Sequence, residues 1–336
     1  MQTFIARHLQ RRSWLSYLLW PLSKIFAVIT RMRRWWYIPA RQFCPSCSVI
    51  SVGNITSGGT GKTPVTIWIA RYLADQGKKV AVSHRGYKGD FEQDEMLLSG
   101  TEEVFAHASR GGDEAYLLAT KLPGIPVIAG RNRTKAITRL LAEYPSLDYI
   151  ILDDSFQHLQ VKHDIDVVVF NALGGIGNGF VLPAGILREP LSALKFADFV
   201  VYNGAGELPA YLQKSSIPVL RGNYRITRFS DVDGHEISVD ELMQKQNILL
   251  SGIGLPRSFE ETIGNMGIPF AEHIMLPDHT DYAGTLARIQ RQCAAADYVI
   301  TTEKDFAKLR HINHHLPLAI TETSFEVEGG QDDLFV

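Results

Sequence analysis

The sequence predicts an α/β protein with a doubly wound, mostly parallel sheet, a second and smaller α/β domain, and an N-terminal helix of different chemistry. Three observations support this prediction. Apolar runs of strand length alternate with helical stretches, which is typical of parallel sheets. The pattern changes to extended, alternating sequence over 219–237. The first 74 residues carry ten Lys or Arg and no acidic residue, although the whole chain has a net charge of −2.

Composition excludes several classes of protein. With 336 residues, 45% hydrophobic and 21% charged, the chain has enough apolar material for a sizeable core and does not resemble a disordered chain. Its three cysteines are too few for a disulfide framework, which favours a reducing compartment. Cys44 and Cys47 have redox spacing, but no second Cys pair completes a zinc site, so we interpret the pair as incidental.

The N-terminal segment 1–40 predicts a basic amphipathic helix at a membrane interface. Its apolar run, 14–29, is interrupted by Pro21 and Lys24 and is shorter than the roughly 20 apolar residues that span a bilayer. It continues into arginines and tryptophans without a cleavage site, which argues against a secretory signal. Packing on the protein's own core is the alternative, and nucleic-acid binding lacks a recognition motif.

Two sets of side chains suit this helix to a lipid surface. Tryptophans favour the headgroup level, and Lys and Arg favour anionic lipid on the cytoplasmic leaflet. The apolar set expected to enter the interface is Trp14, Leu15, Leu18, Leu19, Ile25, Phe26 and Ile29, and the basic set is Lys24, Arg31, Arg33 and Arg34.

The next element is a strand, a glycine-rich turn and a helix, the context of a phosphate-binding loop and of a P-loop NTPase-like domain. The strand 49–52 precedes the turn, and apolar residues from Val65 recur with helical spacing. Lys62 is expected to reach the β- and γ-phosphates, and the Thr63 hydroxyl to bind Mg²⁺. The loop has Thr56 where the standard pattern has glycine, but three glycines remain. The expected ATP-binding residues are Thr56, Ser57, Gly58, Gly59, Thr60, Gly61, Lys62 and Thr63.

The nucleotide is predicted to be ATP. Deviant-loop ATPases carry Lys directly before the Gly-Gly pair, where this chain has Ser57. GTPases need N/T-K-x-D, and the nearest candidate, 302–305, has Lys304 directly beside Asp305.

Carboxylates follow the apolar run 149–152, which predicts a buried parallel strand. Asp153 and Asp154 then lie at the carboxyl edge of the sheet, where ligands of open α/β sheets bind, and are the expected Mg²⁺-side acids. The alternative is an acidic turn without a ligand. His158 follows closely and is either a structural histidine or a member of the site.

A second acidic group is Asp113-Glu114, which follows Gly111-Gly112. Asp113 either caps the helix predicted over 115–122 or serves as a base that accepts a proton from an attacking hydroxyl. The loop 174–190 is long and glycine-rich, a property of functional loops, and ends in Arg188-Glu189, which suits a phosphate or a metal. Asp278-His279 lies in another loop.

The remaining elements follow from periodicity. Expected strands cover 79–83, 125–129, 149–152, 166–170 and 198–202, with helices at 134–143 and 191–196. A hairpin with a turn at Asp233-Gly234 then leads to a second α/β unit. That unit comprises strands 246–252 and 298–301 and helices 258–266 and 285–295. The predicted domains are 41–222, a kinase-type P-loop domain, and 223–336.

Taken in order, these motifs resemble the tetraacyldisaccharide 4′-kinase family of lipid A biosynthesis. The segments that carry the resemblance are Gly53-Asn54 and Gly58–Pro64, Ser83–Tyr87, Gly112–Glu114, Leu152–Asp154 with Phe156–His158, Leu182–Gly185, Leu187–Pro190, Asp278-His279 and Thr302–Asp305. The resemblance implies transfer of the γ-phosphoryl group of ATP, with Mg²⁺, to the 4′-hydroxyl of tetraacyldisaccharide 1-phosphate, forming lipid IVA.

It also implies residue roles, a location and partners. The implied catalytic residues are Lys62, Asp113 as base and His279 as its assistant; the metal-side residues are Thr63, Asp153, Asp154 and Glu189; the substrate-side residues are Glu114, Arg133, His158 and Arg188. The expected location is the cytoplasmic face of the inner membrane, as a peripheral protein. The expected partners are a lipid-tailed disaccharide and an anionic membrane surface, with no nucleic acid and no obligate protein partner.

A membrane-associated regulatory P-loop ATPase is the competing class. Such a protein hydrolyses ATP to switch conformation and phosphorylates nothing. Ser57 in place of the switch lysine, and the separate carboxylate of Asp113, argue against it.

Overall fold

The computed structural model describes residues 8–37, 39–87, 89, 95–105, 108–277, 280, 282–310, 312 and 315–328. Contacts divide the chain into two compact units. The first unit comprises Met1–Asn223 with Val327–Val336, and the second comprises Tyr224–Glu326.

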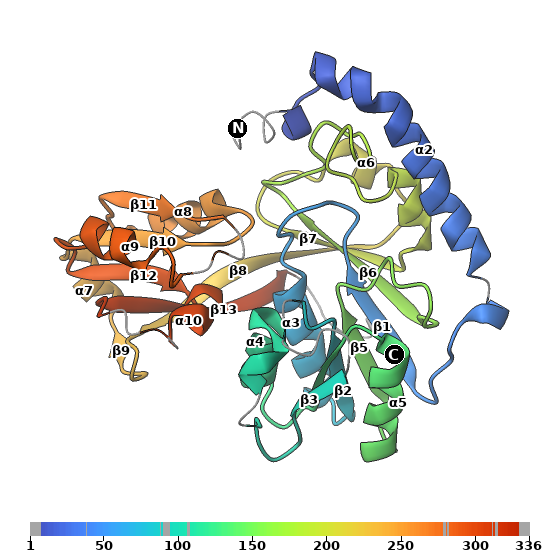
Figure 1. The fold of residues 1–336 in the computed structure, drawn as a ribbon, viewed down its shortest axis with the longest axis horizontal. Helices are drawn as coiled ribbons and strands as arrows, with labels where there is room; N and C mark the ends of the chain where they lie inside the picture. The colour runs from blue at the N-terminus through green and yellow to red at the C-terminus, as the bar shows by residue number, and fades with distance from the viewer. Residues whose placement is uncertain are drawn as a thin grey trace. The chain divides into compact units, whose positions relative to one another are not determined.

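The first unit is built on a sheet whose central strand is β1 (Ser48–Gly53). Parallel pairs join β1 to β5 and β6, and the order is β8-β7-β6-β1-β5-β2-β4-β3, with antiparallel pairing between β3 and β4 (Figure 1). Further strands are β2 (Val80–His84), β3 (Glu95–Ser99), β4 (Val127–Gly130), β5 (Tyr149–Asp153), β6 (Ile165–Asn171), β7 (Phe199–Asn203) and β8 (Val219–Ser230). The prediction of a doubly wound, mostly parallel sheet is confirmed. The edge strand β3 was not expected from the sequence.

Helices follow the strands, as the alternating pattern predicts. The helix α3 (Lys62–Asp75) turns Val65, Ile69 and Leu73 into the core, so its apolar stripe faces the sheet. The expected helix at 191–196 is a 3₁₀ helix. The other helical elements are η1 (Pro39–Arg41), η2 (Ala108–Gly111), α4 (Asp113–Lys121), α5 (Arg133–Glu143), η3 (Leu191–Phe196) and α6 (Ala210–Gln213).

The long N-terminal helix α2 (Trp14–Trp36) lies along the rest of the first unit (Figure 1). Ser13 caps it, and Ser16 and Ser23 are buried. The Ser23 hydroxyl donates to the carbonyl of Val181 at 2.6 Å. Most large apolar side chains of α2 are exposed instead: Trp14, Tyr17, Leu18, Trp20, Leu22, Ile25, Val28, Ile29, Met32, Trp35 and Trp36.

In the expected lipid-facing sets, Leu15 and Leu19 are half-buried, and two further side chains lie elsewhere. Phe26 packs against a buried cluster of the first unit that includes Ile55 and Phe156. Arg34 pairs with Glu189. Within the described residues, no helix combines the length and the apolarity needed to cross a membrane.

In the second unit the strand order is β11-β10-β12-β13-β8, with β9 paired to β8. Parallel pairs join β10 to β11 and β12, and β12 to β13. The expected hairpin is present, because β8 and β9 pair antiparallel around Asp233-Gly234. Its elements are β9 (Glu236–Ile237), α7 (Val239–Met243), β10 (Asn247–Ser251), α8 (Pro256–Asn265), β11 (Glu272–Met275), α9 (Leu286–Gln292), β12 (Tyr298–Thr302), α10 (Glu303–Leu309) and β13 (Leu318–Glu328).

Candidate functional site

The glycine-rich loop lies between β1 and α3, as expected. Gly58 and Gly61 have φ of +110° and +88°, a backbone region that other residues rarely adopt, and Gly61 leads into the first turn of α3. The amide of Asn54 donates to the Thr60 hydroxyl at 2.9 Å. Gln157 donates to the Asn54 carbonyl at 2.8 Å, so the acidic turn braces the loop.

A second brace comes from the glycine-rich segment 174–190. Ser57 N–H donates to the Ile186 carbonyl at 2.7 Å, and Arg188 N–H donates to the Ile55 carbonyl at 2.7 Å. Thr56 in the phosphate loop and Leu187 in this segment therefore form a short antiparallel bridge. The loop is thus braced from two sides.

Asp153 ends β5 and is almost fully buried, with 1% of its surface exposed. The Thr63 hydroxyl donates to its Oδ2 at 2.9 Å, and the Thr66 hydroxyl donates to its Oδ1 at 3.2 Å. Burial raises its pKa, Glu114 and Asp154 add to that rise, and His84 and Lys62 oppose it. Because burial disfavours the charged form of Asp153, a cation beside it would stabilise the carboxylate.

Asp154 pairs with two basic side chains, Lys62 of the phosphate loop and Arg188. Its Oδ1 lies 3.5 Å from Lys62 Nζ and accepts from Arg188 Nη1 at 3.0 Å. Burial raises its pKa, but Lys62 and Arg188 outweigh burial and the net pKa is lowered. Its φ of +51° is a left-handed conformation that costs a non-glycine residue roughly 1–2 kcal/mol. Strain of this kind persists where surrounding contacts fix it, and it gathers at functional sites.

The Asp113-Glu114 turn lies at the same edge of the sheet. The N-cap residue of α4 is Gly112, with φ +86°, and Asp113 is the first helical residue. The N-cap position therefore provides no side-chain hydrogen bond to the helix. A side chain at Gly112 would meet the carbonyl of Tyr87 at 2.6 Å, so the turn packs closely on the segment after β2. The structure therefore does not support the capping alternative for Asp113.

His84 faces Glu114 at the end of β2. Its Nε2 lies 3.5 Å from Glu114 Oε2, and its Nδ1 accepts from the Gly86 N–H at 3.0 Å. Because Nδ1 is an acceptor, a neutral His84 carries its proton on Nε2, toward Glu114. Both residues lie near enough to Asp153 to shift its pKa.

Two of the predicted substrate-side residues are largely enclosed. Arg133 is buried and donates to the Ser83 hydroxyl at 3.0 Å and to the Asp153 carbonyl at 2.5 Å. Burial lowers its pKa to about 10, against the opposing effect of Asp153. Burial and Arg133 lower the pKa of His158 to about 3, so this ring is neutral at pH 7. Its buried Nε2 has no hydrogen-bond partner among the described residues.

Glu189 pairs with Arg34 of α2 and not with Thr63 or Asp153. Arg34 Nε donates to its Oε2 at 2.6 Å and Arg34 Nη2 to its Oε1 at 3.1 Å. Both carboxylate oxygens are therefore engaged by one guanidinium. The structure brings Glu189 to α2, a contact that the sequence did not suggest.

His279 and Asp278 lie outside the described residues. The second unit fixes the residues on either side of them. Leu276 N–H donates to the Ser251 carbonyl at 2.8 Å, and the Tyr282 hydroxyl donates to the buried Asp305 at 2.8 Å. Asp305 also accepts from Gly252 N–H. This last residue of the 302–305 motif therefore joins the loop after β10 to Tyr282.

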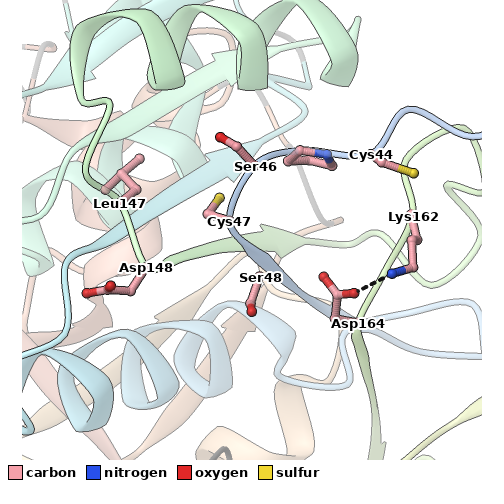
Figure 2. A pocket seen from close by; sticks show the side chains of 9 residues that line it. Cys44, Ser46, Cys47, Ser48, Leu147, Asp148, Lys162 and Asp164 are labelled. Atoms are coloured by element: carbon pink, nitrogen blue, oxygen red, sulfur yellow. Dashed lines mark hydrogen bonds and ion pairs between the residues drawn. The ribbon is translucent and has the colours of Figure 1, made fainter.

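A hollow of about 420 Å³ lies at the amino ends of the strands of the first unit, opposite the phosphate loop (Figure 2). It is lined by residues at the amino ends of β1, β5 and β6 and by Cys44 and Cys47. Ligands of parallel sheets bind at the carboxyl ends, so this hollow is not the phosphate site. Burial raises the pKa of Cys47 to about 11, which keeps its thiol protonated at pH 7. The carboxylates of Asp148 and Asp164 accept backbone hydrogen bonds.

Sequence reasoning missed several supporting side chains. Thr66 donates to Asp153 from the position one turn after Thr63, so helical spacing carried a signal. His84 directly follows a predicted strand, which is also a signal. The contact between Arg34 and Glu189 spans 155 positions in sequence and carried none.

The residues present fit ATP and a divalent cation. The loop offers glycine-rich backbone and Lys62 beside a helix N-terminus, which suit phosphates. Thr63 and Asp153 offer hydroxyl and carboxylate oxygens in contact with one another, the hard donors that Mg²⁺ prefers.

Comparisons with known proteins place this geometry in a family. A model of the family described as LpxK, tetraacyldisaccharide-1-P 4′-kinase, matches residues 15–335. A tetraacyldisaccharide 4′-kinase of Geobacter metallireducens is 39% identical over 265 residues, covering 78% of each chain. One of Desulfotalea psychrophila is 32% identical and covers 98% of each chain. The crystal structure of an apo form of LpxK from Aquifex aeolicus in complex with ATP has a TM-score of 0.72 at 27% identity, covering 94% of this chain and 95% of that one.

Replacing Lys62 tests the phosphate loop. We expect Lys62→Ala to lower kcat/KM for ATP at least 100-fold, or about 3 kcal/mol, because the phosphate charge loses its partner. Lys78→Ala, at an exposed position beyond α3, is the matched control and keeps its kcat/KM. Steady-state kinetics measure both. Near wild-type turnover in Lys62→Ala would rule out this loop as the phosphate site.

Proposed function

Since the chain belongs to the tetraacyldisaccharide-1-P 4′-kinase family, we propose that this site transfers the γ-phosphoryl group of ATP to the 4′-hydroxyl of tetraacyldisaccharide 1-phosphate, forming lipid IVA. The chain is an ATP-dependent kinase of lipid A biosynthesis. The contact between Thr63 and Asp153 carries the proposal, because it joins a phosphate loop to a buried carboxylate at the ligand-binding edge of the sheet.

The phosphate side of the reaction is assigned to four residues. Thr63 and Asp153 would hold Mg²⁺, which when bound neutralises charge on the phosphates. Lys62 and Arg188 are kept at the loop's mouth by Asp154, ready to meet phosphate oxygens. Phosphoryl transfer depends mainly on such positioning and charge stabilisation.

The acceptor side is assigned to Asp113. In the proposed step the 4′-hydroxyl loses its proton to an Asp113 carboxylate oxygen while its oxygen bonds to the γ-phosphorus. The bond from that phosphorus to the bridging oxygen breaks, and ADP leaves. His279 is proposed to assist Asp113, and the Glu114–His84 pair to lie on the acceptor side. The first unit supplies the kinase domain in this proposal.

Four family-implied roles change in the proposal because of the observed contacts. Asp154 pairs with Lys62 and Arg188 and leaves the metal-side set. Arg133 supports the end of β5, since its guanidinium is buried against Ser83 and a backbone carbonyl. Glu189 supports α2 through Arg34 and leaves the metal to Thr63 and Asp153. His158, neutral at pH 7, offers a hydrogen bond and no charge.

The substrate is a lipid A precursor. We propose that its lipid tails keep it in a membrane, so the protein acts at that surface. We propose peripheral binding at the cytoplasmic face of the inner membrane through the outward side of α2. Its exposed aromatic and aliphatic side chains recur with helical spacing and form one stripe. Lys24, Arg31 and Arg33 are exposed on the same helix and suit anionic headgroups.

The transfer itself is tested with γ-³²P-labelled ATP. Incubated with tetraacyldisaccharide 1-phosphate in mixed micelles, the protein is expected to move the label into a lipid that migrates as a bis-phosphorylated product on thin-layer chromatography. Release of the label only as inorganic phosphate would instead identify a regulatory ATPase. Omission of the lipid acceptor is the control for background hydrolysis.

Replacing Asp113 tests the base. We expect Asp113→Ala to lower kcat at least 100-fold with little change in ATP affinity, because proton acceptance contributes about 10²–10⁴-fold. Asp75→Ala, an exposed acid at the end of α3, is the matched control. A thermal melt accompanies the kinetics. A folded Asp113→Ala with unchanged kcat would assign Asp113 to structure alone.

Replacing the outward stripe of α2 tests membrane binding. Each apolar side chain contributes up to about 1.5–3 kcal/mol if fully buried, and each basic one about 1 kcal/mol near anionic lipid. We expect a Trp14→Ser, Leu18→Ser, Trp35→Ser variant to lose flotation with phosphatidylglycerol vesicles, and the wild type to float less with neutral vesicles. Leu173→Ser, at an exposed site outside α2, is the control. Equal flotation of the triple variant and the wild type would show that α2 is not the anchor.

A further inference from the structure

Arg34 differs from its neighbours in the last turn of α2. Arg33, Trp35 and Trp36 are exposed, whereas only 10% of the Arg34 side chain is exposed. The helix therefore presents one arginine inward at the end where its lipid-facing stripe also ends. An inward arginine in a basic surface helix is a costly placement that needs a specific set of partners.

The partners are two segments of the phosphate site. The guanidinium makes a two-bond contact with Glu189, at 2.6 and 3.1 Å, and donates through Nη2 to the Phe156 carbonyl at 3.1 Å. It also stacks on the Phe156 ring, with its Cζ 4.3 Å from the ring centroid, and on Phe196 at 4.9 Å. One side chain thus holds a carboxylate, a carbonyl and two rings.

Those two segments flank Asp154. Phe156 lies two residues after Asp154 in the acidic turn, and Glu189 directly follows Arg188, which pairs with Asp154 at 3.0 Å. Phe156 also approaches the start of the phosphate loop, because a side chain at Gly53 would meet its Cβ at 2.5 Å. Arg34 therefore connects α2 to the backbone on both sides of the Asp154–Arg188 pair.

We propose that Arg34 is a positioning residue for phosphoryl transfer, which sets the acidic turn and Arg188 relative to the phosphate loop and makes their geometry depend on how α2 is seated. The proposal rests on the kinase function proposed above. Arg34 does not touch the reacting atoms in this role. It acts through Glu189 and Phe156, and through them on Asp154 and Arg188.

The chemistry requires a guanidinium. Arg offers parallel N–H donors in one plane and a flat face for stacking, whereas Lys offers a point charge without that plane. Arg34→Lys therefore keeps the charge beside Glu189 but loses the two-bond contact and the stack. Arg34→Gln also loses the charge. The two variants separate a need for charge from a need for geometry.

The experiment compares Arg34→Gln, Arg34→Lys and the wild type in the labelled-phosphate assay, with melting curves and vesicle flotation on the same samples. We expect kcat to fall at least about ten-fold in Arg34→Gln and less in Arg34→Lys, because small displacements of catalytic groups are costly, with KM changed less than about three-fold. Flotation is expected to stay at the wild-type level, since the lipid-facing stripe is intact. Arg139→Gln removes an exposed arginine–glutamate pair on α5 and serves as the matched control with wild-type kcat.

A folded Arg34→Gln whose kcat matches the wild type would overturn the proposal. If Arg34→Gln does not fold, Arg34→Lys decides: wild-type kcat in a folded protein overturns the proposal, and a reduced kcat with unchanged flotation supports it. A loss of flotation that accounts for the loss of turnover would also overturn it. If the wild type itself labels no lipid, the proposed function fails, and the same variants are then compared by ATP hydrolysis, where the same order of rates is expected.

Discussion

The buried carboxylate of Asp153 is the group on which this site depends. A charge with so little exposure is costly unless donors and cations compensate it. Thr63 and Thr66 supply two hydroxyl donors from adjacent turns of α3, and Lys62 and His84 lie near enough to lower its pKa. The position of α3, and with it the phosphate loop, is therefore tied to the end of β5 through this carboxylate.

The surrounding side chains maintain the backbone that presents this carboxylate. Arg133 holds the Asp153 carbonyl, and Gln157 reaches back to the loop residue Asn54. The left-handed backbone at Asp154 is held between these contacts and the pairs with Lys62 and Arg188. In this conformation the Asp154 side chain lies beside two cations, Lys62 and Arg188.

Local pattern predicted the parts of the site that are close in sequence or follow strands. Thr63 and Asp153 were assigned from a strand-turn-helix motif and from a buried strand followed by acids, and the structure brings their side chains together. The antiparallel edge strand β3 gave no comparable signal, since its pattern is short and its pairing partner is set by the sheet. In the second unit, periodicity predicted β10 and β12 but neither β11 nor β13.

The contacts that the sequence did not predict join residues that are far apart in the chain. The sequence suggests a phosphate or a metal for Arg188-Glu189, yet Arg188 binds Asp154 while Glu189 binds Arg34 of α2. Breaking such a buried pair costs about 3–5 kcal/mol, because one charge is left without its partner. The basic character of α2 indicated a surface role for all its arginines. Only packing against Phe156 shows that one of them faces inward.

Calorimetric titration of ATP with and without Mg²⁺ tests the role of Asp153 most directly. The wild type is expected to bind ATP at least about ten-fold more tightly with Mg²⁺, a gain of about 1.4 kcal/mol. Asp153→Asn should keep the metal-free affinity and lose most of that gain, whereas Asp148→Asn, at the opposite edge of the sheet, should keep both. An unchanged Mg²⁺-dependent gain in a folded Asp153→Asn would contradict the account.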